Sequence, residues 1–124
     1  MTRVAIIDDD EAVRASLTLL LESGGYDVRT ADAGDTGVHL ARDFHPDIVL
    51  TDIIMPGCEG IETIMTIRAE HPDARIIAMS GGGRTGNRDY LDLAQEMGAH
   101  AALEKPFDAD TLLDLIGAQV KILR

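Results

Sequence analysis

Polar side chains that can bind a cation and a phosphate group stand where four short apolar runs of this sequence end. These side chains are Asp8, Asp9, Asp52, Ser80 and Lys105. Two carboxylates about 4 Å apart repel by roughly 4 kcal/mol at an effective dielectric near 20, so a trio of them requires a cation. Ligands that are all oxygen select a hard cation, Mg²⁺ before Zn²⁺, and Mg²⁺ favours sites that also offer phosphate oxygens. A hydroxyl and an ammonium would bind those oxygens.

A carboxylate can also attack phosphorus and form an acyl phosphate. Asp52 is the candidate nucleophile, because it follows the apolar run Ile48–Leu50 and precedes a turn at Pro56-Gly57. A single Asp at a strand end more often caps a turn or a helix. The assignment of Asp8 and Asp9 to a metal site therefore depends on Asp52.

Strand-like and helix-like segments alternate along the whole chain. We predict strands over Val4–Ile7, Tyr26–Ala31, Ile48–Asp52, Arg75–Ser80 and Ala101–Glu104. We predict helices from Asp10 to Gly24, over Asp35–Phe44, Glu59–Glu70 and Asn87–Met97, and after Asp108. Five strands alternating with five helices predict an α/β fold, with a parallel sheet covered on both faces by right-handed crossovers. The carboxyl ends of such strands form the edge where open sheets bind ligands.

The apolar positions predict which side of each helix packs on the sheet. For the third helix the predicted inner face consists of Ile61, Ile64, Met65 and Ile67. Asp10 is predicted to be the N-cap of the first helix and Asp108 that of the last.

Composition narrows the classes of function. The 124 residues are predicted to form one domain, residues 1–124, with 11 basic and 22 acidic residues and a net charge of −11. This charge disfavours direct nucleic-acid binding, which needs clustered Lys and Arg. The single Cys58 rules out an internal disulfide and favours a reducing cytosol. No signal peptide or apolar stretch of about 20 residues is present, so we expect a cytoplasmic protein without membrane contact.

The four histidines share no metal-ligand spacing. We assign them to the surface or to helix ends: His39, His45, His71 and His100.

Four stretches of the chain are similar to the motifs of the receiver domain of two-component response regulators. They are Ile6-Ile7-Asp8-Asp9-Asp10-Glu11, Leu50-Thr51-Asp52-Ile53-Ile54-Met55-Pro56-Gly57, Ala78-Met79-Ser80-Gly81 and Glu104-Lys105-Pro106-Phe107. The resemblance covers the full chain. It implies a five-stranded parallel sheet of order 2-1-3-4-5 in a flavodoxin-like, three-layer α/β/α sandwich.

The same resemblance implies the role of each site residue. Asp52 would be the phosphoacceptor, and Mg²⁺ would be held directly by Asp9, Asp52 and the backbone carbonyl of Ile54, with Asp8 helping through water. Ser80 would be the switch hydroxyl. Lys105 would bind the phosphoryl group, and the Lys105–Pro106 peptide bond would be cis.

The resemblance also implies partners. A histidine kinase or a His-containing phosphotransfer protein would supply the phosphoryl group, and the domain would change conformation for a downstream protein. We expect a stand-alone regulator that is a monomer or a weak homodimer. A receiver excised from a larger transcriptional regulator is the alternative.

Two features depart from the usual receiver pattern. Ala102 occupies the position where receivers carry Tyr or Phe, so the usual relay from hydroxyl to aromatic ring cannot operate. The loop after Ser80 is long and rich in glycine. We therefore expect the loop 81–87 to respond to phosphorylation, with Arg84 or Arg88 reaching the new charge, and Ile54 and Gly82 to slow autodephosphorylation.

Two other classes of function remain open. A Mg²⁺-dependent phosphatase with an Asp nucleophile needs a second Asp two residues later, where this chain has Ile54. An unphosphorylated scaffold is disfavoured, because every acidic and lysine position of the motifs is kept. We therefore expect self-phosphorylation and slow autodephosphorylation, but no enzymatic turnover.

Overall fold

Five parallel strands form the centre of the molecule, in the order β2-β1-β3-β4-β5. The computed structural model describes residues 1–53, 60–80 and 87–123, with the backbone alone for 87–90. The strands are β1 (Arg3–Ile7), β2 (Asp27–Ala31), β3 (Ile48–Asp52), β4 (Arg75–Ser80) and β5 (Ala101–Glu104). The α/β fold and the strand order are therefore confirmed, and each strand lies within one residue of its predicted bounds.

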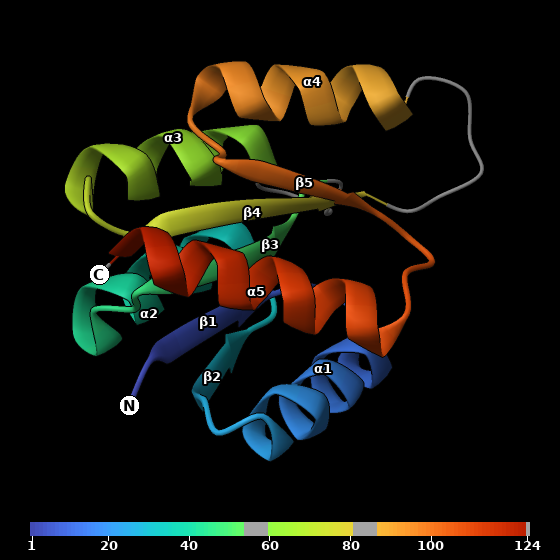
Figure 1. The fold of residues 1–124 in the computed structure, drawn as a ribbon. Helices are drawn as coiled ribbons and strands as arrows, with labels where there is room; N and C mark the ends of the chain where they lie inside the picture. Colours follow the sequence, from blue (N-terminus) through green and yellow to red (C-terminus); the bar gives the residue numbers. More distant parts are fainter. Residues whose placement is uncertain (54–59, 81–86, 124) are drawn as a thin grey trace.

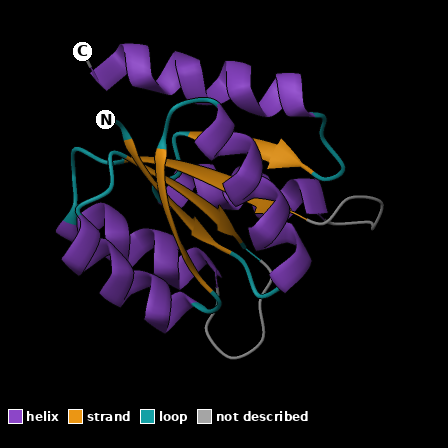
Figure 2. Ribbon diagram, turned by 90° about the horizontal axis from the view of Figure 1, so that it is seen from below, coloured by secondary structure: helices purple, strands orange, loops and turns teal. Residues whose placement is uncertain are grey.

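Helices cover both faces of this sheet (Figures 1 and 2). They are α1 (Glu11–Ser23), α2 (Gly34–Phe44), α3 (Gly60–Glu70), α4 (Asn87–Met97) and α5 (Ala109–Leu123). Helix α2 begins one residue before its predicted start, and the predicted start of α3, Glu59, lies outside the described residues. None of the described helices combines the length and the apolar character that a bilayer span needs.

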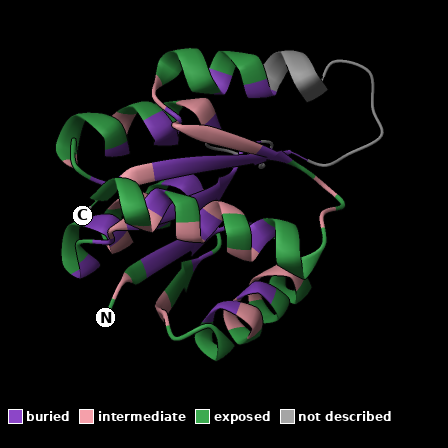
Figure 3. Cartoon of the chain, in the orientation of Figure 1, coloured by how far each residue is buried: buried purple, intermediate pink, exposed green. Residues whose placement is uncertain are grey.

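The two faces of the sheet carry separate apolar clusters, because side chains alternate along each strand. One cluster packs the strands against α1 and α5 and includes Ile6, Leu50 and Met79. The other packs them against α2, α3 and α4 and includes Val49 and Ile76. Figure 3 shows the buried central strands β1, β3 and β4 between the partly exposed helices. The sheet is thus fixed from both sides, which holds the carboxyl ends of its strands in place.

The predicted caps of the first and last helices are confirmed. The Asp10 carboxylate accepts hydrogen bonds from the backbone N–H groups of Ala12, at 2.9 Å, and Val13, at 3.3 Å. The Asp108 carboxylate accepts one from Thr111 at 2.7 Å. Each cap satisfies backbone donors that have no partner inside the helix.

The predicted inner face of α3 was wrong at one position. Met65 is 48% exposed, whereas Thr63 is buried together with Ile64 and Ile67. The buried positions Gly60, Thr63, Ile64 and Ile67 recur at spacings of three and four residues and form one face of α3, and Met65 lies outside that face. The prediction placed Met65 inward because it considered hydrophobicity alone.

His100, which we assigned to the surface or to a helix end, has a structural role. It precedes β5 and is half-buried, and its Nδ1 accepts a hydrogen bond from the backbone N–H of Ile76 at 3.0 Å. The backbone N–H of His100 donates to the Ile76 carbonyl at 2.7 Å. Burial lowers the pKa of His100, and the positive charges of Arg75 and Arg68 lower it further. Neutral His100 therefore ties the chain before β5 to the beginning of β4.

This contact predicts that stability falls in mild acid. Because the pKa of His100 in the folded state lies below its ordinary value of about 6.5, the contribution is complete above that pH and is lost as the pH falls toward the folded-state value. His100→Asn keeps an acceptor but cannot titrate. Urea unfolding at about pH 7.5 and about pH 5.5 should show that the wild type loses stability relative to this variant.

The exposed His39→Asn serves as the control, and it should follow the wild type at both pH values. If the stabilities of the wild type and His100→Asn changed with pH in parallel, the proposed contribution of neutral His100 would be contradicted.

Candidate functional site

The predicted site residues meet at the carboxyl edge of the sheet. Asp8 follows β1, Asp52 ends β3, Ser80 ends β4 and Lys105 follows β5. The register aligns Asp52 with Met79 of β4 and Ser80 with Glu104 of β5. Because all strands are parallel, their ends bring these four residues together from distant parts of the chain.

Three carboxylates form the acidic part of the site. Asp8, Asp9 and Asp52 each offer an oxygen, and these oxygens all lie within 4.8 Å of one another. Asp8 is fully buried and Asp52 is 7% exposed, whereas Asp9 faces solvent. Carboxylates this close repel strongly where water is scarce, so the cluster must be held by positive charge.

Lys105 supplies part of that charge. Its Nζ lies 2.9 Å from Oδ2 of Asp8 and 3.3 Å from Oδ2 of Asp52. Burial alone lowers the pKa of Lys105, but the hydrogen bond to Asp8 and the charges of Asp52 and Asp8 outweigh that effect. The pKa lies above its ordinary value, and the side chain is a cation at neutral pH.

The turn that carries Asp8 is fixed by further hydrogen bonds. The Asp8 N–H donates to the Ala31 carbonyl at 3.1 Å, and Asp8 Oδ1 accepts from the Asp10 N–H at 2.9 Å. Nη1 of Arg14 donates to the Asp8 carbonyl at 2.7 Å. Sequence reasoning missed Arg14, because nothing in the pattern distinguishes this arginine from a solvated residue of the helix.

Ser80 is fully buried at the end of β4, and its carbonyl accepts a hydrogen bond from the Lys105 N–H at 2.8 Å. The hydroxyl and the lysine are therefore coupled through the backbone. The Lys105–Pro106 bond is cis, as the resemblance implies. Ala102 is half-buried in β5 opposite Ala78 of β4.

Several predicted features lie outside the described residues. They are the backbone carbonyl of Ile54, the Pro56-Gly57 turn, Cys58, and the loop residues Gly82 and Arg84. Arg88 lies in α4, where the structure describes the backbone alone. The predictions made for these residues stay predictions.

The residues present suit a divalent cation. Three carboxylates and one ammonium leave two negative charges, which one divalent ion would neutralise. All the side-chain donors are carboxylate oxygens, the ligands that Mg²⁺ prefers over softer nitrogen and sulfur atoms. No histidine or cysteine of the described residues belongs to this cluster.

Comparison with known proteins finds a matching family and similar proteins. The model of the family "Response regulator receiver domain" matches residues 4–117. The chain is 36% identical over 120 residues to Protein PilH of Pseudomonas aeruginosa, covering 95% of this chain and 97% of PilH. It is 31% identical to the cell cycle transcriptional regulator CtrA of Caulobacter vibrioides, covering 96% of this chain but only 50% of CtrA.

Solved structures extend the similarity to the fold. A CheY-like response regulator receiver domain protein from Methanospirillum hungatei superposes with a TM-score of 0.90 at 27% identity. That match covers 99% of this chain and 96% of the other.

The geometry predicts that Mg²⁺ stabilises the folded chain through Asp9. Binding to the native state alone adds about 1.4 kcal/mol at ten times Kd. Thermal melts followed by circular dichroism should rise with Mg²⁺ in the wild type, and Asp9→Asn should remove the increase.

Asp10→Asn is the matched control. It removes the same charge two residues after Asp8, but asparagine keeps the helix cap, so the increase should persist. Equal melting temperatures of the wild type with and without Mg²⁺ would contradict a formed metal site.

Proposed function

Because this chain belongs to the response regulator receiver domain family, we propose that it accepts a phosphoryl group on Asp52 and changes conformation for a protein partner. Members of this family act as switches that accept phosphorylation. One observation carries the proposal for this chain: the Lys105 ammonium bridges the carboxylates of Asp8 and Asp52, and Asp52 ends the central strand of the sheet.

The reaction is a transfer between two nucleophiles. An Asp52 carboxylate oxygen bonds to phosphorus while the bond from phosphorus to the donor's imidazole nitrogen breaks. The electron pair of the broken bond stays with the donor nitrogen, and the product is an acyl phosphate. Asp52 suits this role better than Asp8, since Asp8 is fully buried, whereas Asp52 is 7% exposed at the end of the central strand.

The residues around Asp52 can compensate the negative charge of the phosphoryl group. When bound, Mg²⁺ would be held by Asp9 and Asp52, with Asp8 acting through water, and it would offset the negative charge of the phosphoryl group. The Lys105 ammonium can form an ion pair with a phosphoryl oxygen on Asp52, since its Nζ already lies 3.3 Å from the Asp52 carboxylate. Buried Ser80 can donate its hydroxyl hydrogen to another of these oxygens.

We infer that the phosphoryl donor is a histidine kinase or a His-containing phosphotransfer protein in the cytoplasm. The match over nearly the full length of PilH favours a regulator that acts as a single receiver by protein contact. The chain spans about half of CtrA, so a receiver of a larger transcriptional regulator is the second candidate.

We further propose that the chain does not turn over free substrates. Among the described residues the carboxylates of the site are Asp8, Asp9 and Asp52. A phosphatase with an Asp nucleophile needs a second Asp two residues after the first as its general acid, and this chain has Ile54 at that position.

Acetyl phosphate with Mg²⁺ should add one phosphoryl group, which intact mass detects, and hydroxylamine should remove it. Asp52→Asn should abolish the addition, because an amide cannot form the acyl phosphate. Addition that persists in Asp52→Asn would place the acceptor elsewhere.

Lys105→Ala tests the role of the cation separately. Its loss exposes the charges of Asp8 and Asp52, so the melting temperature without Mg²⁺ should fall. The increase on adding Mg²⁺ should be at least as large as in the wild type, because no competing cation remains. A lost Mg²⁺ effect with unchanged stability would mean that the roles of Lys105 and Asp9 are reversed.

A further inference from the structure

Asp9 has the least support of the three carboxylates that meet at the site. Asp8 accepts hydrogen bonds on both of its oxygens, from the Asp10 N–H at 2.9 Å and from Lys105 at 2.9 Å, and Asp52 lies 3.3 Å from the same ammonium. The Asp9 side chain is exposed and forms no hydrogen bond or salt bridge with the described residues. Its place beside the other two carboxylates therefore depends on the backbone that carries it.

That backbone is held at the two peptide groups that flank Asp9. The Asp8 carbonyl, in the peptide group before Asp9, accepts a hydrogen bond from Nη1 of Arg14 at 2.7 Å. The Asp10 N–H, in the peptide group after Asp9, donates to Oδ1 of Asp8 at 2.9 Å. No second donor to the Asp8 carbonyl is found among the described residues. The orientation of the first peptide group therefore depends on Arg14.

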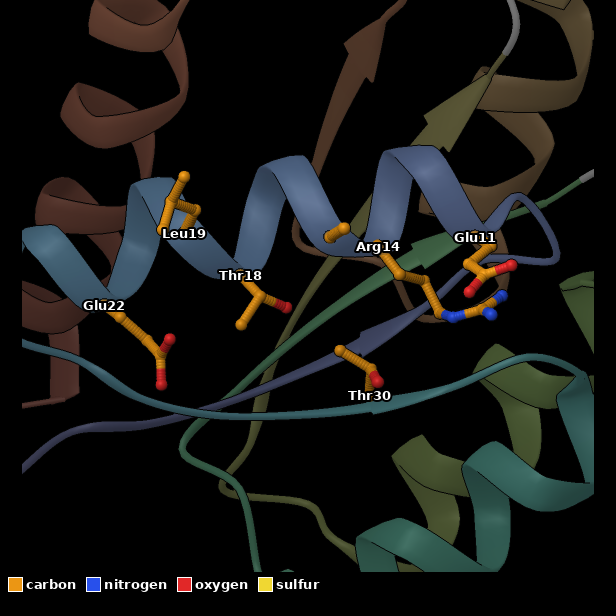
Figure 4. Close-up of a pocket in the computed structure, with 7 residues that line it drawn as sticks. Glu11, Arg14, Thr18, Leu19, Glu22 and Thr30 are labelled. Carbon is orange, nitrogen blue, oxygen red and sulfur yellow. The ribbon is translucent and has the colours of Figure 1, made fainter.

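Helix α1 places the Arg14 side chain for this contact. The Arg14 N–H donates to the Asp10 carbonyl at 3.0 Å, so the residue lies one turn after the helix cap. Its half-buried side chain lines two adjoining hollows, one together with Glu11 and Thr30 and the other together with Thr30 and Asp32. Figure 4 shows the guanidinium directed back toward the beginning of α1, below Glu11 in the view. These two acidic neighbours favour a cation here, although neither forms a salt bridge with it.

We propose that Arg14 is a positioning residue of the magnesium site, which raises the affinity for Mg²⁺ by fixing the peptide group that carries Asp9. Because it acts on the metal site, this role rests on the proposed function. A ligand that is held in place before the metal arrives loses less freedom on binding. Removing a hydrogen-bond partner that orients a metal ligand typically weakens metal binding by about tenfold or more.

The charge of Arg14 alone would have the opposite effect. A guanidinium beside the acidic turn repels a divalent cation, so its removal would strengthen Mg²⁺ binding if charge were the whole of its influence. Loss of the hydrogen bond to the Asp8 carbonyl would weaken binding instead. The direction in which Kd changes therefore separates positioning from charge.

The first test is the Mg²⁺ affinity of Arg14→Met, which keeps an aliphatic stem but removes the donor and the charge. Titration with magnesium chloride, followed by the amide signals of ¹⁵N-labelled protein, should give a Kd about tenfold larger than that of the wild type. Arg14→Lys keeps the charge and a donor on a shorter side chain. It should recover part of the affinity, with a Kd that still exceeds that of the wild type.

Lys121→Met is the matched control for charge. Lys121 is exposed in the last turn of α5, and Leu123 in the same turn lines a hollow with Thr2 at the opposite edge of the sheet. The variant changes the net charge as Arg14→Met does, but salt screens a charge at that distance, so its Kd should stay within about twofold of the wild type.

Phosphorylation by acetyl phosphate separates positioning from a purely structural role. The Mg²⁺ concentration that gives half of the maximal rate should rise about tenfold in Arg14→Met. The rate at saturating Mg²⁺ should match that of the wild type, because Arg14 contacts neither Asp52 nor the ammonium of Lys105. Thermal melts without Mg²⁺ show where each variant is folded, and Arg14→Lys is the test variant if Arg14→Met does not fold.

Two results would overturn the role of Arg14 and leave the proposed function intact. One is a Kd of Arg14→Met that is equal to or smaller than that of the wild type, while Asp9→Asn still loses Mg²⁺ binding. The other is a lower rate at saturating Mg²⁺ with an unchanged Kd. Absence of Mg²⁺ binding in the wild type would instead contradict the metal site itself, and the role of Arg14 with it.

Discussion

The site depends on one electrostatic constraint, the gathering of three carboxylates at the edge of an apolar sheet. Asp8 is completely buried, and Lys105 reaches both Asp8 and Asp52 with one ammonium group. A buried pair of this kind is weak evidence for stability, since desolvation offsets much of the attraction. Its consequence is specificity, because it joins the ends of β1, β3 and β5. It also leaves an excess of negative charge that a divalent ion would neutralise.

The fold could be predicted because its determinants are local in the sequence. Runs such as Ile48–Leu50 have the length and composition of buried parallel strands, and the capping residues Asp10 and Asp108 mark where helices begin. Once the strands are parallel, the residues that follow them must share one edge. The meeting of Asp8, Asp52 and Lys105 therefore follows from topology, although the strand order itself came from the family resemblance.

Other features could not be predicted, because they depend on distances that a pattern does not contain. The bond from Arg14 to the Asp8 carbonyl needs a particular rotamer and turn geometry. His100 accepts a backbone hydrogen bond across 24 positions, and no ligand spacing or periodicity indicates such a contact. Met65 and Thr63 show the limit of hydrophobicity, since the orientation of α3 decides which of them is buried.

The contact between Lys105 and Asp8 joins residues that are 97 positions apart. Contacts between distant residues form late, because the entropy of closing the intervening chain must be overcome first. During synthesis the acidic residues of β1 and β3 leave the ribosome long before their lysine does. A partly made chain thus holds its carboxylates without the cation that organises them, and the site that we propose for phosphorylation is complete only once β5 has joined the sheet.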